Sequence, residues 1–247
     1  MALLCLQLEW GADEAIDVDP IDRLRPVAAK PVPPPRPAST PTHGTPGERA
    51  LAAAAQATTL EELRAAIAGF DGCALRDTAS NLVFAEGNSA SPTLIIGDAP
   101  GREEDRSGHP FAGAEGELLD QVLGSIGLTR ADLMLTPLLP WRPPGGRPPS
   151  PSEIAICQPF LHRLIVLLKP HRLVVFSGLA ARSLLPPTQN RRRHPRGWIE
   201  TSIPGMGTPL PSLALPGLPE LLKNPPLRRD AWAGLRLLRR ALDETQT

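Results

Sequence analysis

The sequence predicts an α/β fold in which helices cover both faces of a parallel β-sheet. The first observation is a set of short apolar runs at residues 93–96, 172–176 and 209–215, each short enough to be a buried strand. The second is that segments with a helical spacing of apolar residues stand between these runs. Strands that alternate with helices along a chain typically form a parallel sheet with helices on both faces.

Capping residues and apolar stripes predict the helices. Thr59, with a glutamate three residues later, opens a helix over 59–69 in a capping-box pattern. Ser150 opens a long helix to about residue 168 in the same way. The remaining expected elements, in chain order, are a helix over 115–126, an apolar run over 133–139, a helix over 178–185 and a helix over 228–242.

The proline content divides the 247-residue chain. Residues 18–47 contain nine prolines and little apolar content, which is typical of a disordered or polyproline-type linker. We therefore expect a short N-terminal segment over 1–17, a linker over 18–47 and one domain over 48–247. The N-terminal segment is a candidate docking helix for a protein partner.

Composition indicates a cytoplasmic protein. The chain has no run of 18 apolar residues, and its start lacks the basic region and cleavage site of a signal peptide. Three cysteines form an odd and sparse set, which argues for a reducing compartment. We expect no membrane association and a monomer.

Charge is unevenly distributed along a chain whose formal net charge is zero. Residues 1–140 carry 10 basic and 20 acidic side chains, whereas residues 141–247 carry 16 and 6. Basic clusters in loops suggest a polyanion partner, although ordinary solvated charge is an equally good interpretation. The residues expected to contact the phosphates of such a partner are Arg142, Arg147, Arg191, Arg192, Arg193 and Arg196.

One carboxylate, Asp98, stands at the tip of the predicted strand over 93–96, in the segment GDAPG. Ligands of α/β proteins gather at the carboxyl ends of the strands, so Asp98 is a candidate functional residue. The alternative is a turn-forming role, because aspartate suits strand ends. No G-x-G-x-x-G fingerprint and no Walker loop follows the strand, which excludes those nucleotide-binding motifs.

The segment GDAPGREEDRSGHPFAGAEGELLD resembles the first motif of the bacterial family 4 uracil-DNA glycosylases. The similarity continues in order through WRPPGGRPPSPSEIAICQPFL, KPHRLVVFSGLAARSLL and LLKNPPLRRDAW, and covers roughly residues 70–240. It implies a three-layer α/β/α sandwich with a central four-stranded parallel sheet. It also implies base excision DNA repair, in which the N-glycosidic bond of a flipped uracil or related damaged base is hydrolysed.

The resemblance assigns roles to the residues of this motif. Asp98 occupies the position of the acid that serves the water, and is one methylene shorter than the family's glutamate. Phe111 occupies the position that stacks on uracil. The base-binding residues implied by the motif are Gly97, Ala99, Pro100, Gly101, Pro110 and Phe111.

Two functional positions of the family are changed. Where the family has a base-reading asparagine, this chain has Pro137, which lacks an amide side chain and an N–H group. The family's late histidine falls on Leu215 or Gly217. His109, beside the stacking position, is interpreted as a loop cap, with an approach to the base as the alternative. The changes leave two hypotheses, a weakened glycosylase and a catalytically silent module that binds DNA or a repair partner.

The metal site of the family is also changed. Many members hold a four-iron cluster through four cysteines, and only Cys73 and Cys157 match ligand positions here. Phe70 and Trp141 stand at the other two. We therefore expect no cofactor and no metal, with an apolar contact through Phe70 and Trp141 in place of the cluster.

Overall fold

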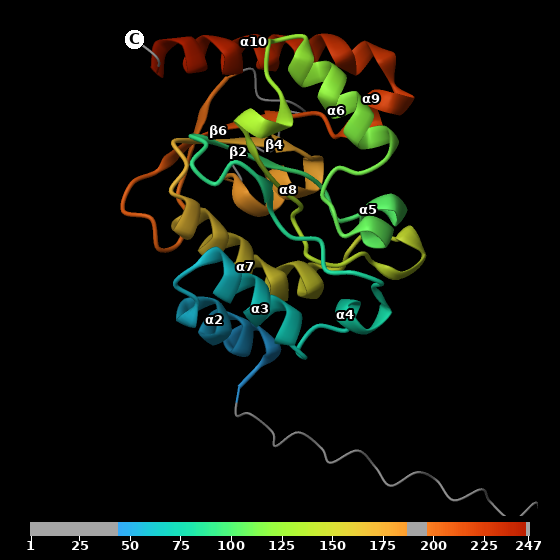
Figure 1. Cartoon of the computed structure of the whole chain (residues 1–247), viewed down its shortest axis with the longest axis vertical. Coiled ribbons are helices and arrows are strands. Elements are labelled where there is room, and N and C mark those ends of the chain that lie inside the picture. The colour runs from blue at the N-terminus through green and yellow to red at the C-terminus, as the bar shows by residue number, and fades with distance from the viewer. Residues whose placement is uncertain (1–43, 187–196, 246–247) are drawn as a thin grey trace, which may run out of the picture. The chain divides into compact units, whose positions relative to one another are not determined.

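Six strands form one sheet in the computed structural model, which describes residues 44–186 and 197–245. The strand order is β1-β3-β2-β4-β6-β5, and Figure 1 labels β2, β4 and β6 near the centre of the molecule. The four central strands are mutually parallel, as expected. They are β3 (Met134–Thr136), β2 (Thr93–Ile96), β4 (Arg172–Phe176) and β6 (Leu210–Leu215).

Two short antiparallel strands extend the predicted four-stranded sheet at its edges. β1 (Glu86–Gly87) pairs with β3, and β5 (Ile199–Thr201) pairs with β6. These strands were not expected, because two or three residues are too few to show a strand pattern in the sequence. At Gly87, φ is 114°, and a Cβ atom would collide with the Leu133 carbonyl, so the β1 pairing depends on a glycine there.

Strand residues alternate between two helical layers. Ile95, Val174 and Leu213 belong to a core cluster with α6 (Ala114–Gly124), α9 (Leu218–Lys223) and α10 (Arg228–Thr245). Leu94 and Val175 belong to a second cluster with α7 (Pro151–Leu168) and α8 (Gly178–Leu184). Figure 1 shows the sheet between these two layers, with α10 and α7 on opposite sides. The expected three-layer α/β/α sandwich is confirmed.

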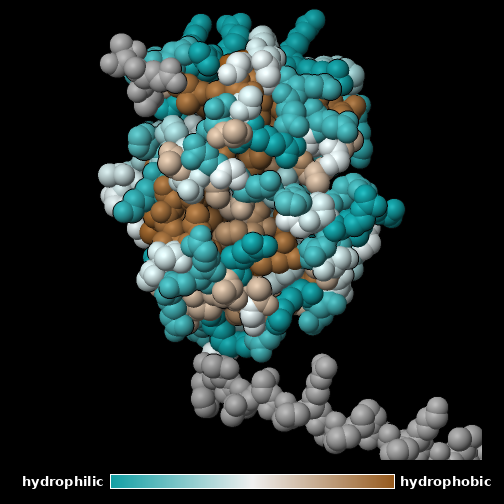
Figure 2. All heavy atoms as spheres, in the orientation of Figure 1, coloured by the Kyte–Doolittle hydropathy of each residue, from teal (hydrophilic) through white to brown (hydrophobic). Residues whose placement is uncertain are grey.

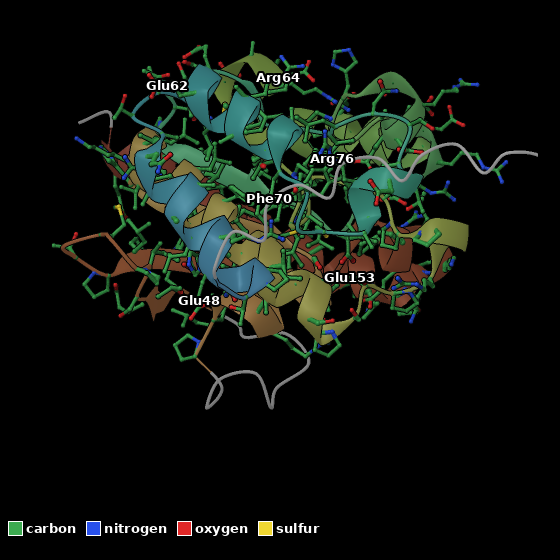
Figure 3. All side chains as sticks on the ribbon, turned by 90° about the horizontal axis from the view of Figure 1, so that it is seen from below. Glu48, Glu62, Arg64, Phe70, Arg76 and Glu153 are labelled. Carbon is green, nitrogen blue, oxygen red and sulfur yellow. The ribbon has the colours of Figure 1, made fainter. Side chains whose placement is uncertain are left out.

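A helical hairpin at the start of the described chain packs against α7. It consists of α2 (Pro46–Gln56) and α3 (Leu60–Gly69), which contribute to the same core cluster as α7. Thr59 caps α3 with the expected capping box, and Figure 3 labels the partner Glu62. α2 was not expected, and it begins inside the range 18–47 that was assigned to the linker. The part of that range before residue 44, and the segment 1–17, lie outside the described residues.

The other predicted helices form within a few residues of their expected bounds. Ser150 caps α7 through a capping box, and Ser177 caps α8. Three short helices were missed, α4 (Leu75–Thr78), α5 (Arg102–Ser107) and α9. On the face drawn in Figure 2, hydrophobic residues reach the surface in separate patches among hydrophilic ones. No helix within the described ranges has the length and apolar character needed to cross a membrane.

Candidate active site at the carboxyl edge of the sheet

Asp98 lies where the carboxyl ends of β2 and β3 meet. Gly97 and Asp98 directly follow β2, and the Gly97 N–H donates a 2.9 Å hydrogen bond to the Thr136 carbonyl. The Leu138 N–H donates to the Asp98 carbonyl at 3.2 Å. These bonds join the loops after the two strands, so Asp98 is held at the edge where α/β proteins bind ligands.

The Asp98 carboxyl is half-buried and contacts the end of β4. Burial raises its pKa, and a hydrogen bond with the Ser177 side chain opposes that rise. The Ser177 hydroxyl oxygen accepts from the N–H groups of Leu179 at 3.1 Å and Ala180 at 2.9 Å. Its hydrogen is therefore directed to Asp98. The sequence alone missed Ser177, because only the sheet brings the ends of β2 and β4 together.

Phe111 forms an aromatic wall next to Asp98. Its ring is buried against the backbone of Gly97, where a Cβ atom would lie only 2.7 Å from the Phe111 Cζ. Any residue larger than glycine at position 97 would displace the ring. Phe111 also has a φ of 53°, a left-handed conformation that is uncommon for a bulky residue. The structure thus brings together Gly97, Asp98 and Phe111, as the motif implied.

The Glu104 carboxylate connects the acid loop to the aromatic wall. One of its oxygens accepts from the Gly101 N–H at 2.6 Å, and the other accepts from the Phe111 N–H at 2.5 Å. Gly101 caps α5, so the turn over Ala99 and Pro100 leads directly to this contact. Glu104 lies in the acidic part of the recognised motif, but the sequence assigned it no role.

Arg130 holds the carbonyl side of the same aromatic residue. Its guanidinium donates to the Phe111 carbonyl at 2.8 Å and to the Pro110 carbonyl at 3.4 Å. Asp120 orients the guanidinium through a 2.6 Å ion pair. At Gly116 a Cβ atom would collide with the Phe111 carbonyl, so α6 approaches this loop only because it carries glycine there. The backbone of Phe111 is therefore held on both sides.

Three carboxyl groups crowd this part of the site. Burial raises the pKa of Glu104, and the nearby Asp98 charge adds to that rise. Burial raises the pKa of Glu115 to about 7, helped by the charges of Glu104 and Asp98 and opposed by Lys223. At neutral pH the Glu115 carboxyl is thus partly protonated, which limits the negative charge around Asp98.

The two changed family positions lie at the same edge. Pro137 is buried directly after β3, and its carbonyl accepts from the Thr136 hydroxyl. Leu215 packs into the core against α10, where it contacts the Gly234 position. A Cβ atom at position 217 would instead lie 3.8 Å from the Phe176 carbonyl oxygen and 3.9 Å from the Ser177 Cα. Of the two candidate positions for the missing histidine, Gly217 is therefore the one near Asp98.

His109 does not complete the site. Its Nδ1 lies 2.8 Å from a carboxylate oxygen of Glu86, and both side chains are exposed. This contact connects the loop to β1, which agrees with its interpretation as a loop residue. Its backbone N–H donates a 3.2 Å hydrogen bond to the Ser107 hydroxyl, so this group is also engaged within the loop.

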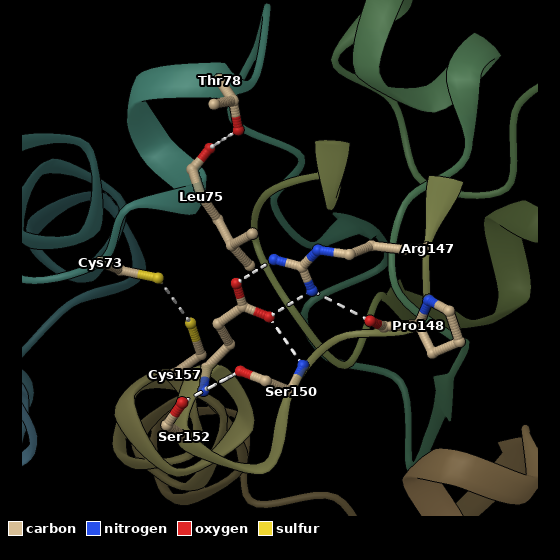
Figure 4. Close-up of polar contacts among 9 residues, drawn as sticks. Cys73, Leu75, Thr78, Arg147, Pro148, Ser150, Ser152 and Cys157 are labelled. Carbon is tan, nitrogen blue, oxygen red and sulfur yellow. Dashed lines mark hydrogen bonds and ion pairs between the residues drawn. The ribbon is translucent and has the colours of Figure 1, made fainter. Parts of the chain in front are cut away.

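The basic residues predicted to contact DNA have different surroundings. Arg147 forms two hydrogen bonds with the Glu153 carboxylate, at 2.6 and 2.9 Å, as Figure 4 shows. This pairing lowers the pKa of Glu153 to about 2. The Arg147 charge is therefore paired with a carboxylate six residues later in the chain. Arg142 is half-exposed in the same loop. The residues Arg191, Arg192, Arg193 and Arg196 lie outside the described residues.

The donor set around the two matching cysteines does not fit a four-iron cluster. Cys73 and Cys157 are buried with their sulfur atoms 4.0 Å apart. Phe70 and Trp141, at the other two ligand positions, are buried members of the same core cluster. A cluster of this type needs thiolates that neither residue supplies. The hydrogen bond between the sulfurs lowers the pKa of Cys73 to about 7 and, with burial, raises that of Cys157.

The chain has a parallel sheet between two helical layers, with an acid and an aromatic wall at the carboxyl edge of the sheet. These features place it in the class of α/β/α proteins that bind ligands at that edge. Residues 84–236 match the family model of the uracil DNA glycosylase superfamily. This match covers more than half of the chain, and the chain belongs to that superfamily.

Curated relatives are type-4 uracil-DNA glycosylases. The chain is 36% identical over 126 residues to the protein of Pyrobaculum aerophilum, covering 51% of this chain and 64% of the relative. It is 41% identical over 109 residues to that of Archaeoglobus fulgidus, covering 44% and 55%. It is 36% identical over 108 residues to that of Thermotoga maritima, covering 44% and 56%. The chain thus spans less than two thirds of the length of these relatives.

Glu104→Gln tests the connection between the acid loop and the aromatic wall. A glutamine oxygen can accept only one of the two N–H groups, and its amide would face the other as a second donor. We expect a loss of about 1–3 kcal/mol in the free energy of unfolding and faster amide exchange at Phe111. Urea denaturation and hydrogen exchange measure these effects.

Glu103→Gln is the matched control, because Glu103 is the exposed neighbour of Glu104 on α5 and pairs only with Arg106 among the ion pairs of the described chain. The control should retain wild-type exchange at Phe111. Equal behaviour of the two variants would contradict the role given to Glu104.

Glu115→Gln tests the raised pKa of Glu115, which burial and the neighbouring carboxyl groups cause. The folded state raises the pKa of Glu115 from 4.5 to about 7, so it binds more protons than the unfolded state between these values. Wild-type stability should therefore fall as the pH rises from about 5 to 8, by on the order of 1–3 kcal/mol relative to Glu115→Gln. Urea denaturation across this range measures the difference, and Glu117→Gln on the exposed face of α6 is the control. A difference between the Glu115→Gln variant and wild type that stays constant with pH would contradict the raised pKa of Glu115.

Proposed function

We propose that this protein binds DNA and hydrolyses the N-glycosidic bond of a flipped uracil or related damaged base, with weakened activity. The observation that carries the proposal is that Glu104 joins Gly101, in the loop that carries Asp98, to Phe111 at the sheet edge. An acid and an aromatic wall held in fixed relation suit a flipped base and an attacking water. The names of the curated relatives support the same reaction class.

The proposed reaction begins with a nucleotide that leaves the stack and enters the site. The Phe111 ring supplies a stacking surface for the base. Asp98, aligned by the Ser177 hydroxyl, orients the water and offsets the positive charge that develops on the sugar. Because its carboxyl is half-buried, this charge interaction is stronger than it would be in water.

Stabilisation of the departing base is the weak part of this site. Pro137 has no side-chain donor for the base, and Gly217 supplies no side chain beside Ser177. Loss of one donor to a developing anion typically lowers a rate by about 10²–10³. We therefore propose that uracil excision is far slower than in proteins that retain both groups.

Positive side chains near the site support DNA as the partner. The positive charge of Arg182 favours the ionised form of Asp98, and that of Lys223 favours the ionised form of Glu115. Both basic side chains are exposed. These two exposed positive charges lie close enough to act on the carboxyl groups of the site, and such charges suit DNA phosphates. Such contacts would make DNA binding weaken as salt increases, since each neutralised phosphate releases counterions.

A catalytically silent DNA-binding module is the second candidate. The specific observation that favours it is the buried Pro137 at the base-reading position, which removes an amide and an N–H group together. This candidate retains the positive side chains and the fold but has no excision activity. A cytoplasmic location, a monomeric state and a repair partner for segment 1–17 remain proposals derived from the sequence.

Asp98→Asn tests the reaction. Wild-type protein should cleave single-stranded or duplex oligonucleotides containing uracil slowly, and the variant should lose this activity because it keeps the shape but not the charge of the carboxylate. DNA binding should be retained. Product formation is measured after alkaline cleavage of abasic sites, and binding by fluorescence anisotropy at several salt concentrations.

The control is Asp77→Asn, which removes an exposed carboxylate on α4 and should leave both measurements unchanged. Excision that persists in Asp98→Asn would place the catalytic group elsewhere. Salt-sensitive binding without excision by wild type would favour the silent module, and absence of binding at low salt would exclude both candidates.

Iron analysis tests the absence of the cluster. Because two of the four ligand positions are Phe70 and Trp141, the purified protein should be colourless and contain no stoichiometric iron. Anaerobic purification followed by metal analysis and absorption spectroscopy provides the measurement. A brown protein with about four irons per chain would contradict the proposal.

A further inference from the structure

Two cysteines that are distant in sequence meet in the core beneath the helical hairpin. Cys73 lies in the irregular turn between α3 and α4, and Cys157 lies in the second turn of α7. Their sulfur atoms are 4.0 Å apart although 84 positions separate the two residues in the chain. Figure 4 draws the contact between the two side chains. Both side chains are at most 2% exposed. The cysteines therefore face each other without water between them.

The surroundings favour a bond between these sulfurs. A disulfide has an S–S distance of about 2.05 Å, so the two sulfur atoms must approach by about 2 Å. Cys157 is fixed within an 18-residue helix, whereas Cys73 belongs to a short turn preceded by Gly72. Small dihedral changes in this turn can supply the approach without moving a helix.

A small hollow adjoins the buried pair on the Cys157 side. A hollow in the surface is lined by Cys157, together with Val83, Phe84 and Phe160. Its apolar lining gives no site for a charged or bulky reagent. Hydrogen peroxide is neutral and about the size of two water molecules, so it is the class of oxidant that suits this approach.

We propose that Cys73 and Cys157 are a disulfide-forming pair that hydrogen peroxide oxidises. One sulfur, as a thiolate, attacks a peroxide oxygen, which breaks the O–O bond and gives a sulfenic acid and hydroxide. The second sulfur then attacks the sulfenic sulfur and displaces its oxygen, and the thiol proton completes a water molecule. In total, two thiols and one peroxide give one disulfide and two waters.

The bond would fasten the end of the hairpin to α7. It closes a loop of 84 residues that contains Asp98, Phe111 and Pro137. A cross-link of this length restricts the unfolded chain strongly, so the oxidised protein should be more stable than the reduced one. For a domain of this size the expected rise in Tm is on the order of 5–10 °C.

The test uses the full chain carrying Cys5→Ser, which removes the third cysteine. Reduced protein is treated with hydrogen peroxide, unfolded, alkylated and digested, and its Tm is measured before and after treatment. We expect loss of both free thiols, a cross-linked peptide joining Cys73 to Cys157, and the higher Tm. Dithiothreitol should reverse all three changes.

Cys73→Ser provides the matched control, because it changes the turn residue and leaves α7 intact. It should show no cross-link and no rise in Tm after peroxide. Two results would overturn the proposal: both thiols remaining alkylatable after treatment, or oxidation to sulfinic and sulfonic acids without a cross-link. Comparing one protein in its two redox states keeps the test valid even if a cysteine variant folds poorly.

Discussion

The site depends on the two hydrogen bonds that the Glu104 carboxylate accepts. Without them, nothing would hold the N–H of Phe111 while its backbone adopts a φ of 53°, a conformation that costs free energy in a bulky residue. Arg130 completes the hold at the Phe111 carbonyl. The glycines follow from this arrangement, since Gly97 leaves room for the ring and Gly116 leaves room for the carbonyl. Several residues of the segment from Gly97 to Gly116 thus accommodate the strained backbone of Phe111.

Bringing Glu104 so close to Asp98 has an electrostatic consequence. Each buried carboxyl group opposes ionisation of the next, and Glu115 adds a third charge to the group. The protein limits the resulting repulsion with protonation of Glu115, with Lys223 and with the Ser177 hydroxyl at Asp98. The carboxylate that positions the aromatic wall therefore also adds to the rise that burial causes in the pKa of Glu115, so a change at Glu104 alters both the wall and the ionisation of Glu115.

The sequence predicted the central sheet because its signals are local. The run over 172–176 coincides with β4, and the Thr59 and Ser150 caps lie where α3 and α7 begin. The features that the sequence did not predict are either very short elements or contacts that only the tertiary structure creates. β1 pairs only two residues, and the Ser177 contact exists only because β4 lies beside β2. Asp98 and Phe111 were predicted only through a family motif, since neither residue alone carries a distinctive pattern.

The structure also distinguishes two kinds of change relative to the family. At the positions where the resemblance expects cluster ligands, Phe70 and Trp141 are buried with Cys73 in one apolar core, so these two side chains contribute to packing. No such compensation accompanies Gly217, which leaves the space beside Ser177 without a side chain. Leu215 cannot supply the missing group, because it packs against α10. Apolar side chains thus pack the core at positions 70 and 141, whereas the sheet edge beside Ser177 has no side chain at position 217.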